Sequence, residues 1–163
     1  MGEIEGDGPV AETITLTRVF AAECVEAVPP GESKVMVLRR LVQSLASAGK
    51  LKGKRVEDVV DALMEREQIG TTGMGKGIAM PHLKTEAVCD CVGAIGVAPE
   101  GVDFDSLDGL PARLIFMVLS PPERHEDHLE ILKRVAQLLC DRTIHYEDHF
   151  PRTAEKLFAY LGF

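Results

Sequence analysis

Hydrophobic residues recur along the chain with two spacings, one typical of helices and one of strands. Segments 33–49 and 56–67 place apolar residues at i, i+3, i+4 and i+7, which predicts two amphipathic helices. Ser33 stands where an N-cap is expected, and Gly49 stands where glycine commonly ends a helix. The same spacing predicts a helix over residues 127–140 and a last helix that begins at Thr153.

Short apolar runs predict the strands. Segments 88–97 and 112–119 are apolar at nearly every position, which is typical of central strands buried on both faces. A run over 24–28 predicts another strand, and alternation over 14–17 predicts an edge strand. Since strands and helices interleave without a strict βαβ repeat, we expect a single α/β domain, a mixed β-sheet flanked by helices, over residues 11–163. Residues 1–10 are expected to be a flexible leader.

Composition and charge narrow the classes of function. The 163 residues are 45% hydrophobic, which suits one globular domain, and the net charge of −8 argues against nucleic-acid binding. The apolar runs are too short to span a bilayer, and the N-terminal residues lack the features of a signal peptide, so we expect a cytoplasmic protein without membrane insertion. The four cysteines include no CxxC pair and are expected to be free thiols.

The candidate chemistry gathers in segment 66–82. Four glycines lie within residues 70–77, and glycine lets backbone N–H groups approach an anion closely. His82 follows this loop, and a neutral imidazole can act as a nucleophile at neutral pH. Arg66 precedes the loop and offers a permanently charged guanidinium. These parts together predict a site that accepts a phosphoryl group.

The sequence also contains residue patterns that are similar to two other kinds of site. Residues 70–77 nearly match the nucleotide-binding pattern G-x-x-x-x-G-K-S/T, but Gly77 replaces the Mg²⁺ ligand and the loop follows a helix instead of a strand. The spacings His125-x-x-His128 and His145-x-x-x-His149 contain ligand types that suit zinc, but no H-E-x-x-H motif occurs. We therefore expect neither a metal nor another cofactor.

Segment 66–82, R-E…G-T-T-G…G…G-I-A-M-P-H, resembles the enzyme IIA domain of the bacterial phosphotransferase system, of the fructose/mannitol/nitrogen-regulatory type. Further similar positions are the run V-D-F-D at 102–105, Asp108-Gly109 and His128-Leu129 at the start of the helix that follows. The similarity covers roughly residues 14–161. Two positions depart from the family: Leu83 replaces a glycine or other small residue, and Ala112 replaces a more usual valine.

The resemblance implies a mannitol/fructose enzyme IIA-like fold and a phosphotransferase component. It implies that the histidine phosphocarrier protein phosphorylates His82, with Arg66 and His128 beside the phosphohistidine. Taken with the loop composition, it assigns the phosphate cradle to five residues: Thr71, Thr72, Gly73, Gly75 and Gly77. On composition alone, a histidine at a helix start such as His128 is more often a polar cap.

Three functions remain open at this point. The chain could be a regulatory, nitrogen-type IIA whose phosphorylation state selects a regulated partner. It could instead be a sugar-specific IIA that passes phosphate to a IIB cysteine, or a binding module that no longer accepts phosphate. The sequence has no attached IIB, carrier or membrane domain, which favours the regulatory branch. The presence of His82, Arg66 and His128 argues against the binding module.

Overall fold

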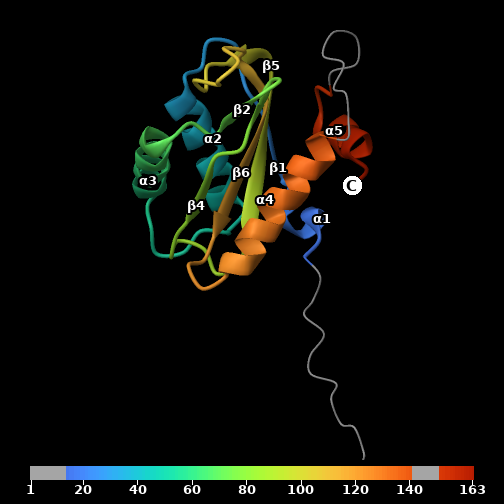
Figure 1. The fold of residues 1–163 in the computed structure, drawn as a ribbon. Coiled ribbons are helices and arrows are strands. Elements are labelled where there is room, and N and C mark those ends of the chain that lie inside the picture. The colour runs from blue at the N-terminus through green and yellow to red at the C-terminus, as the bar shows by residue number, and fades with distance from the viewer. Residues whose placement is uncertain (1–13, 141–150) are drawn as a thin grey trace, which may run out of the picture.

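The computed structural model describes residues 14–140 and 151–163 (Figure 1). Its elements in chain order are α1 (Leu16–Val19), β1 (Phe20–Ala27), α2 (Lys34–Ser47), α3 (Val56–Ile69), β2 (Gly73–Gly75), β3 (Ile78–Ala79), β4 (His82–Lys84), β5 (Val92–Val102), β6 (Ala112–Ser120), α4 (His125–Cys140) and α5 (Ala154–Leu161). The expected leader, and the histidines at 145 and 149, lie outside the described residues.

The helices predicted from periodicity are confirmed. Their apolar stripes face the sheet. The Ser33 hydroxyl accepts a hydrogen bond from the backbone N–H of Met36 and caps α2. Thr153 caps α5 in the same way. The edge strand predicted over 14–17 is wrong, since Leu16–Val19 forms the short helix α1. A run of four residues is too short for its hydrophobic spacing to distinguish a strand from a helical turn. In the helical form, Val19 packs against the core.

The sheet is mixed, as expected. Its strand order is β1-β5-β6-β3-β2, and β4 pairs with β6 beside this path. β5 and β6 are antiparallel, whereas β1 runs parallel to β5, and β3 and β4 both run parallel to β6. β3 and β4 follow β6 in one register, with Ile78 opposite Leu114 and His82 opposite Val118. They therefore follow β6 as one line of strand that is interrupted at Met80-Pro81, with β2 paired outside β3.

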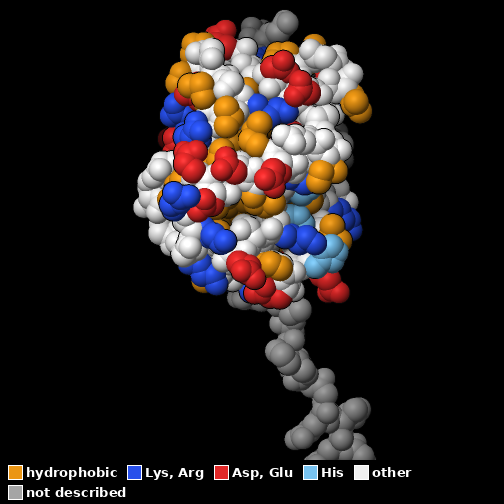
Figure 2. All heavy atoms as spheres, turned by 90° about the vertical axis from the view of Figure 1, so that its left-hand side faces the viewer, with side chains coloured by type: hydrophobic (Ala, Val, Ile, Leu, Met, Phe, Trp, Pro, Cys, Tyr) orange, Lys and Arg blue, Asp and Glu red, His pale blue; other side chains and the backbone are white. Residues whose placement is uncertain are grey.

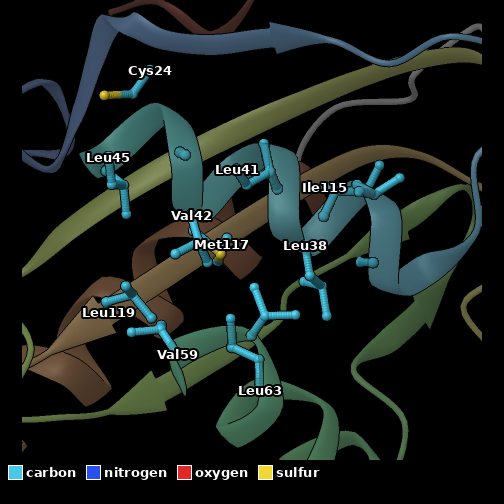
Figure 3. Packing of buried hydrophobic residues seen from close by; sticks show 14 of the residues in the cluster. Cys24, Leu38, Leu41, Val42, Leu45, Val59, Leu63, Ile115, Met117 and Leu119 are labelled. Carbon is cyan, nitrogen blue, oxygen red and sulfur yellow. The ribbon is translucent and has the colours of Figure 1, made fainter. Parts of the chain in front are cut away.

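Helices cover both faces of the sheet. Figure 1 shows α2 and α3 on one side and α1, α4 and α5 on the other. Figure 3 shows α2 and α3 side by side on this face, with Leu38, Leu41 and Leu45 of α2 among Leu63, Met117 and Leu119. A second cluster joins the opposite face of β5 and β6 to α4 and α5 through Phe116, Ile131 and Leu157. The apolar runs of β5 and β6 are thus explained by burial on both faces.

Two further findings, on the cysteines and on membrane-spanning helices, apply to the described residues. The thiols of Cys24, Cys89 and Cys91 are free. Among 14–140 and 151–163, no helix combines the length and the hydropathy that crossing a bilayer requires.

Candidate functional site

The candidate site lies at β4, between the end of α3 and the start of α4. His82 is the first residue of β4, and α3 packs against this strand. His128 comes from the first turns of α4 and lies with its ring centroid 5.5 Å from that of His82. His82 is half-buried and His128 is buried. Figure 2 views the molecule from the side on which α3 lies. On this face, histidine side chains lie next to lysine or arginine side chains, beside a hollow with hydrophobic side chains at its base.

The tautomer of His82 is fixed by its own backbone. Its Nδ1 lies 2.8 Å from the carbonyl oxygen of Met80, two residues earlier. A carbonyl oxygen can only accept, so Nδ1 carries the proton and Nε2 keeps its lone pair. Burial, and next the positive charge of Arg66, lower the pKa of His82 below its ordinary value, although the Met80 hydrogen bond and Glu67 oppose this. At neutral pH the ring is therefore neutral, with Nε2 available as a nucleophile.

His128 is held neutral more strongly. Its Nδ1 lies 2.8 Å from the hydroxyl oxygen of Ser120, the last residue of β6. Burial is the main cause that lowers the pKa of His128 from 6.5 to about 4, with His82, Lys84 and His125 adding repulsion. A buried neutral imidazole anchored through one nitrogen can present its other nitrogen to a group bound at His82.

Arg66 lies in the last turn of α3, just before the glycine-rich segment, as predicted. Its Nη1 donates a 3.1 Å hydrogen bond to the carbonyl of Gly70, which fixes the side chain across the end of the helix. After burial, its positive charge is the second cause that lowers the pKa of His82. The structure thus brings His82 into contact with His128, which comes from a distant segment, and places Arg66 near enough for its charge to act on His82.

Glu67 is a site residue that the sequence reasoning left without a role. Its carboxylate is buried and accepts hydrogen bonds from the backbone N–H of Thr72 at 3.3 Å and from the Thr72 hydroxyl. Lys34 donates to the same carboxylate at 3.1 Å. The Thr72 carbonyl accepts from the N–H of Met80 at 2.9 Å, and the Met80 carbonyl in turn holds His82. A hydrogen-bonded chain therefore runs from Glu67 to the imidazole.

A signal for Glu67 was present in the sequence. It lies four residues after Leu63, on the stripe of α3 that is otherwise apolar and packs against the core. An acidic residue at such a position needs partners, because an unpaired buried charge is costly. The position could have been noticed, but its partners on α2 and at Thr72 could not.

The glycine-rich segment forms a β-hairpin, β2–β3, instead of an open loop. The N–H of Gly73 donates to the Thr71 hydroxyl oxygen at 3.0 Å, and that hydroxyl donates to the carbonyl of Phe104. The N–H of Lys76 donates to Asp108 at 2.7 Å. Positive φ angles of 85° at Gly75 and 78° at Gly77 serve the turn of this hairpin. These amides and hydroxyls are thus already used within the fold.

The hairpin also separates the expected cradle residues from one another. Thr72 lies at its base and bonds to Met80, next to His82. Gly77 lies at its tip, and its carbonyl accepts from the N–H of Arg113 at 2.7 Å. Five residues along a strand span about 16 Å, so the structure does not bring Gly77, or Gly75 opposite Ile78, to the imidazole. Thr72 is tied to the site by its hydrogen bonds to Met80 and Glu67.

Lys84 and His125 extend the site on the α4 side, and neither was assigned a role from sequence. The Lys84 ammonium donates a 3.0 Å hydrogen bond to Nδ1 of His125. Both residues are exposed. No group of three potential metal ligands occurs among the described residues. The contact joins residues 41 positions apart, so no local pattern could have indicated it.

Comparison with known proteins gives one family. The sequence model of "Phosphoenolpyruvate-dependent sugar phosphotransferase system, EIIA 2" matches residues 18–146. A fructose-specific EIIA component of Haloferax volcanii is 36% identical over 129 residues, covering 79% of this chain and 82% of the relative. A nitrogen regulatory protein of Bradyrhizobium diazoefficiens is 33% identical over 147 residues, covering 90% and 94%.

Solved structures agree with this result. The nitrogen regulatory protein IIA-Ntr of Neisseria meningitidis superposes with a TM-score of 0.77 at 29% identity, covering 90% of this chain and 98% of that one. The IIA mannitol enzyme of Escherichia coli, in a complex with phosphorylated IIB, gives a TM-score of 0.66 at 21% identity, covering 88% and 99%. The second likeness concerns the fold alone.

Proposed function

This chain belongs to the EIIA 2 family of the phosphoenolpyruvate-dependent sugar phosphotransferase system, and from this premise we propose that it carries phosphate as a phosphohistidine on Nε2 of His82. One observation supports the proposal above all. Nδ1 of a neutral His82 is committed to the Met80 carbonyl, which leaves Nε2 as the free nucleophile of a half-buried ring.

The transfer balances without a base or a metal. The lone pair of Nε2 forms a bond to phosphorus while the bond from phosphorus to the donor imidazolium nitrogen breaks, and its electron pair stays on the donor. The donor leaves as a neutral imidazole. His82 becomes a phosphoimidazolium whose Nδ1 proton remains in the hydrogen bond to Met80. The carbonyl thereby stabilises the positive charge that appears on the ring.

Arg66 and His128 are the proposed contacts of the transferred group. Negative charge spreads over three phosphoryl oxygens during transfer, and Arg66 offers a planar fork of donors to them. His128 can donate from its second nitrogen while Ser120 holds the first. Thr72 acts through Glu67 and Met80 to position His82. The remaining residues expected for the cradle, Thr71, Gly73, Gly75 and Gly77, have structural roles in this proposal.

The proposed donor is the histidine phosphocarrier protein, which places the reaction in the cytoplasm. An exposed apolar rim supports docking of a protein to the site, because Ile69 and Leu129 flank it with 84% and 52% exposure. We favour a regulatory, nitrogen-type role, since the nitrogen regulatory protein of Bradyrhizobium diazoefficiens and IIA-Ntr of Neisseria meningitidis each cover 90% of this chain, against 79% for the fructose-specific EIIA component. The alternative is a sugar-specific IIA that passes its phosphate to a IIB cysteine.

The test is incorporation of labelled phosphate from phosphoenolpyruvate in the presence of enzyme I and the phosphocarrier protein. The wild-type chain should gain an acid-labile label, and the His82→Ala variant should gain none while its circular dichroism stays that of the wild type. The imidazole ¹⁵N resonances of the labelled chain should identify Nε2 as the phosphorylated atom. Label on both proteins would mean that another histidine is the acceptor, and His128 would be replaced next.

The two branches are separated by what happens to the label. A sugar-specific chain transfers it to the cysteine of a cognate IIB domain within the time of the assay. A regulatory chain keeps it and changes its affinity for a protein partner on phosphorylation. No label on the wild type, with a donor shown to be active, would favour the non-phosphorylated binding module.

A further inference from the structure

We propose that Lys84 is a second cationic ligand of the phosphoryl group on His82, and that His125 holds its ammonium in place until the phosphate arrives. This inference rests on the proposed function of His82. Arg66 contacts the phosphoryl group from the α3 side, and Lys84 adds a second cation that contacts it from the α4 side.

The strand geometry carries the first part of the argument. His82 and Lys84 are two residues apart in β4, and their pairing with Val118 and Ser120 of β6 is continuous. Residues i and i+2 of a strand project from the same face and lie about 7 Å apart. A lysine side chain is long enough to span such a distance. Its ammonium can therefore reach a group attached to Nε2 of His82.

The contact with His125 carries the second part. His125 and His128 are three residues apart on α4, which places both on the side of the helix that faces β4. The Lys84 ammonium donates to Nδ1 of His125, and His128 lies against His82. The ammonium is thus held close to the histidine pair by a neutral acceptor that does not neutralise its charge.

The surrounding charges explain why the ammonium should move on phosphorylation. Burial, and then His82, Lys84 and His125 in that order, lower the pKa of His128, so the positive charge of Lys84 already acts on the site. A phosphoryl group adds one to two negative charges beside it. A charge-assisted contact from ammonium to phosphate is stronger than a hydrogen bond to a neutral imidazole, so the dianion competes successfully with His125.

The test uses the full chain and the equilibrium of transfer with the phosphocarrier protein. Lys84→Gln should lower the equilibrium constant for formation of the phosphorylated chain by about threefold to tenfold, the effect of one solvent-exposed charged contact. Lys84→Arg should restore most of it. Lys133→Gln removes the same charge from an exposed position two turns further along α4 and should leave the constant unchanged. The constant compares free species, so altered docking of the donor does not affect it.

A second measurement reports on His125 directly. Phosphorylation of the wild type should shift the Nδ1 resonance of His125, because its hydrogen bond from Lys84 is lost. The shift should be absent from Lys84→Gln. A labelled wild type with an unchanged equilibrium constant in Lys84→Gln, or a His125 resonance that does not respond, would overturn this inference alone. A wild type that takes phosphate neither from the carrier protein nor from phosphoramidate would overturn the proposed function and this inference with it.

Discussion

The protonation of a single ring decides when this site can react. The lone pair of His82 is lost once Nε2 is protonated, and the pKa of the ring is lowered first by burial and then by Arg66. The rate of phosphate acceptance should therefore fall on the acid side, with its midpoint at a lower pH than the ordinary histidine value of about 6.5. Single-turnover labelling as a function of pH measures the position of the acid limb.

Arg66→Ala tests the electrostatic part of this explanation. Removing the guanidinium takes away a charge that lowers the pKa of His82, so the acid limb should move to higher pH. The plateau rate should also fall, since a proposed phosphoryl contact is lost. Arg39→Ala is the matched control, because its guanidinium is paired with Glu57 on the exposed side of α2. An acid limb at the same pH in Arg66→Ala and wild type would contradict the prediction.

Glu67 is the residue whose loss should affect stability and reactivity together. Glu67→Gln removes the charge that faces Lys34 and weakens both hydrogen bonds from Thr72. Lys34 keeps its contact with Asp105, so we expect a loss of about 2 kcal/mol in the free energy of unfolding, less than for a fully isolated buried charge. Urea denaturation measures it.

The control for that variant is Glu65→Gln, on the exposed face of the same helix. It should change the free energy of unfolding by less than about 0.5 kcal/mol. Glu67→Gln should in addition slow phosphate acceptance, because Met80 and His82 are held through Thr72. Equal effects of the two variants would remove Glu67 from the positioning chain.

At the scale of elements, the β2–β3 hairpin depends on a close approach between Gly73 and the turn after β5. A Cβ at position 73 would collide with the hydroxyl of Ser106 and lie 3.0 Å from the carbonyl oxygen of Phe104. Gly73→Ala should therefore destabilise the protein by about 1–3 kcal/mol. Thermal or urea unfolding gives the value.

A double-mutant cycle isolates the collision. The Ser106 hydroxyl is buried and has no hydrogen-bond partner among the described residues, so Ser106→Ala alone should cost little. In combination it should recover part of the stability lost in Gly73→Ala, because the nearest atom is gone while Phe104 remains. Strict additivity of the two changes would show that the hydroxyl is not the obstacle.

The elements also show where sequence reasoning succeeded. Helices α2 to α5 and strand β6 are long enough for their spacing to be diagnostic, and the bounds predicted for them agree within a few residues. Strand β5 was predicted over 88–97 but spans Val92–Val102. The glycine-rich segment was correctly located, but its form was not. A glycine-rich segment can form either a hairpin turn or an anion cradle. Here β2 pairs with β3, and β3 pairs with β6, so the segment forms a hairpin.

The site was partly predictable for the same reason. His82, Arg66 and His128 carry a recognisable pattern, and the structure brings His82 into contact with His128 and places Arg66 near enough for its charge to act on His82. Contacts between β4, β6 and α4 identify three further residues of the site that the sequence did not indicate: Ser120, Lys84 and His125. Such contacts follow from pairing of distant segments, which periodicity does not encode.

For the whole molecule, burial of neutral His128 couples stability to pH. Its pKa is about 4 when folded and about 6.5 when unfolded, so between these values the unfolded chain binds more protons than the folded one. The free energy of unfolding should decrease as the pH falls from about 6.5 towards 4, with a loss from this residue of roughly 2 kcal/mol between pH 7 and pH 5.

Comparison of variants separates this contribution from that of other titrating groups. His128→Gln should show a smaller loss of stability between pH 7 and pH 5 in urea denaturation than the wild type does. His125→Gln, which changes an exposed histidine of the same helix, should match the wild type. A wild-type pH dependence retained by His128→Gln would refute the assignment.

The edges of the sheet have a consequence for solubility. Among the described strands, β1 has a pairing partner on one side only, and it carries the exposed Glu23 and the half-buried Glu26. At the opposite edge Pro81, which lacks an N–H, interrupts the line of β3 and β4. Charges and proline on edge strands disfavour pairing with a second chain. The molecule can thus keep a reactive strand at the rim of its sheet, open to a docking partner, without inviting the strand-to-strand association that leads to aggregates.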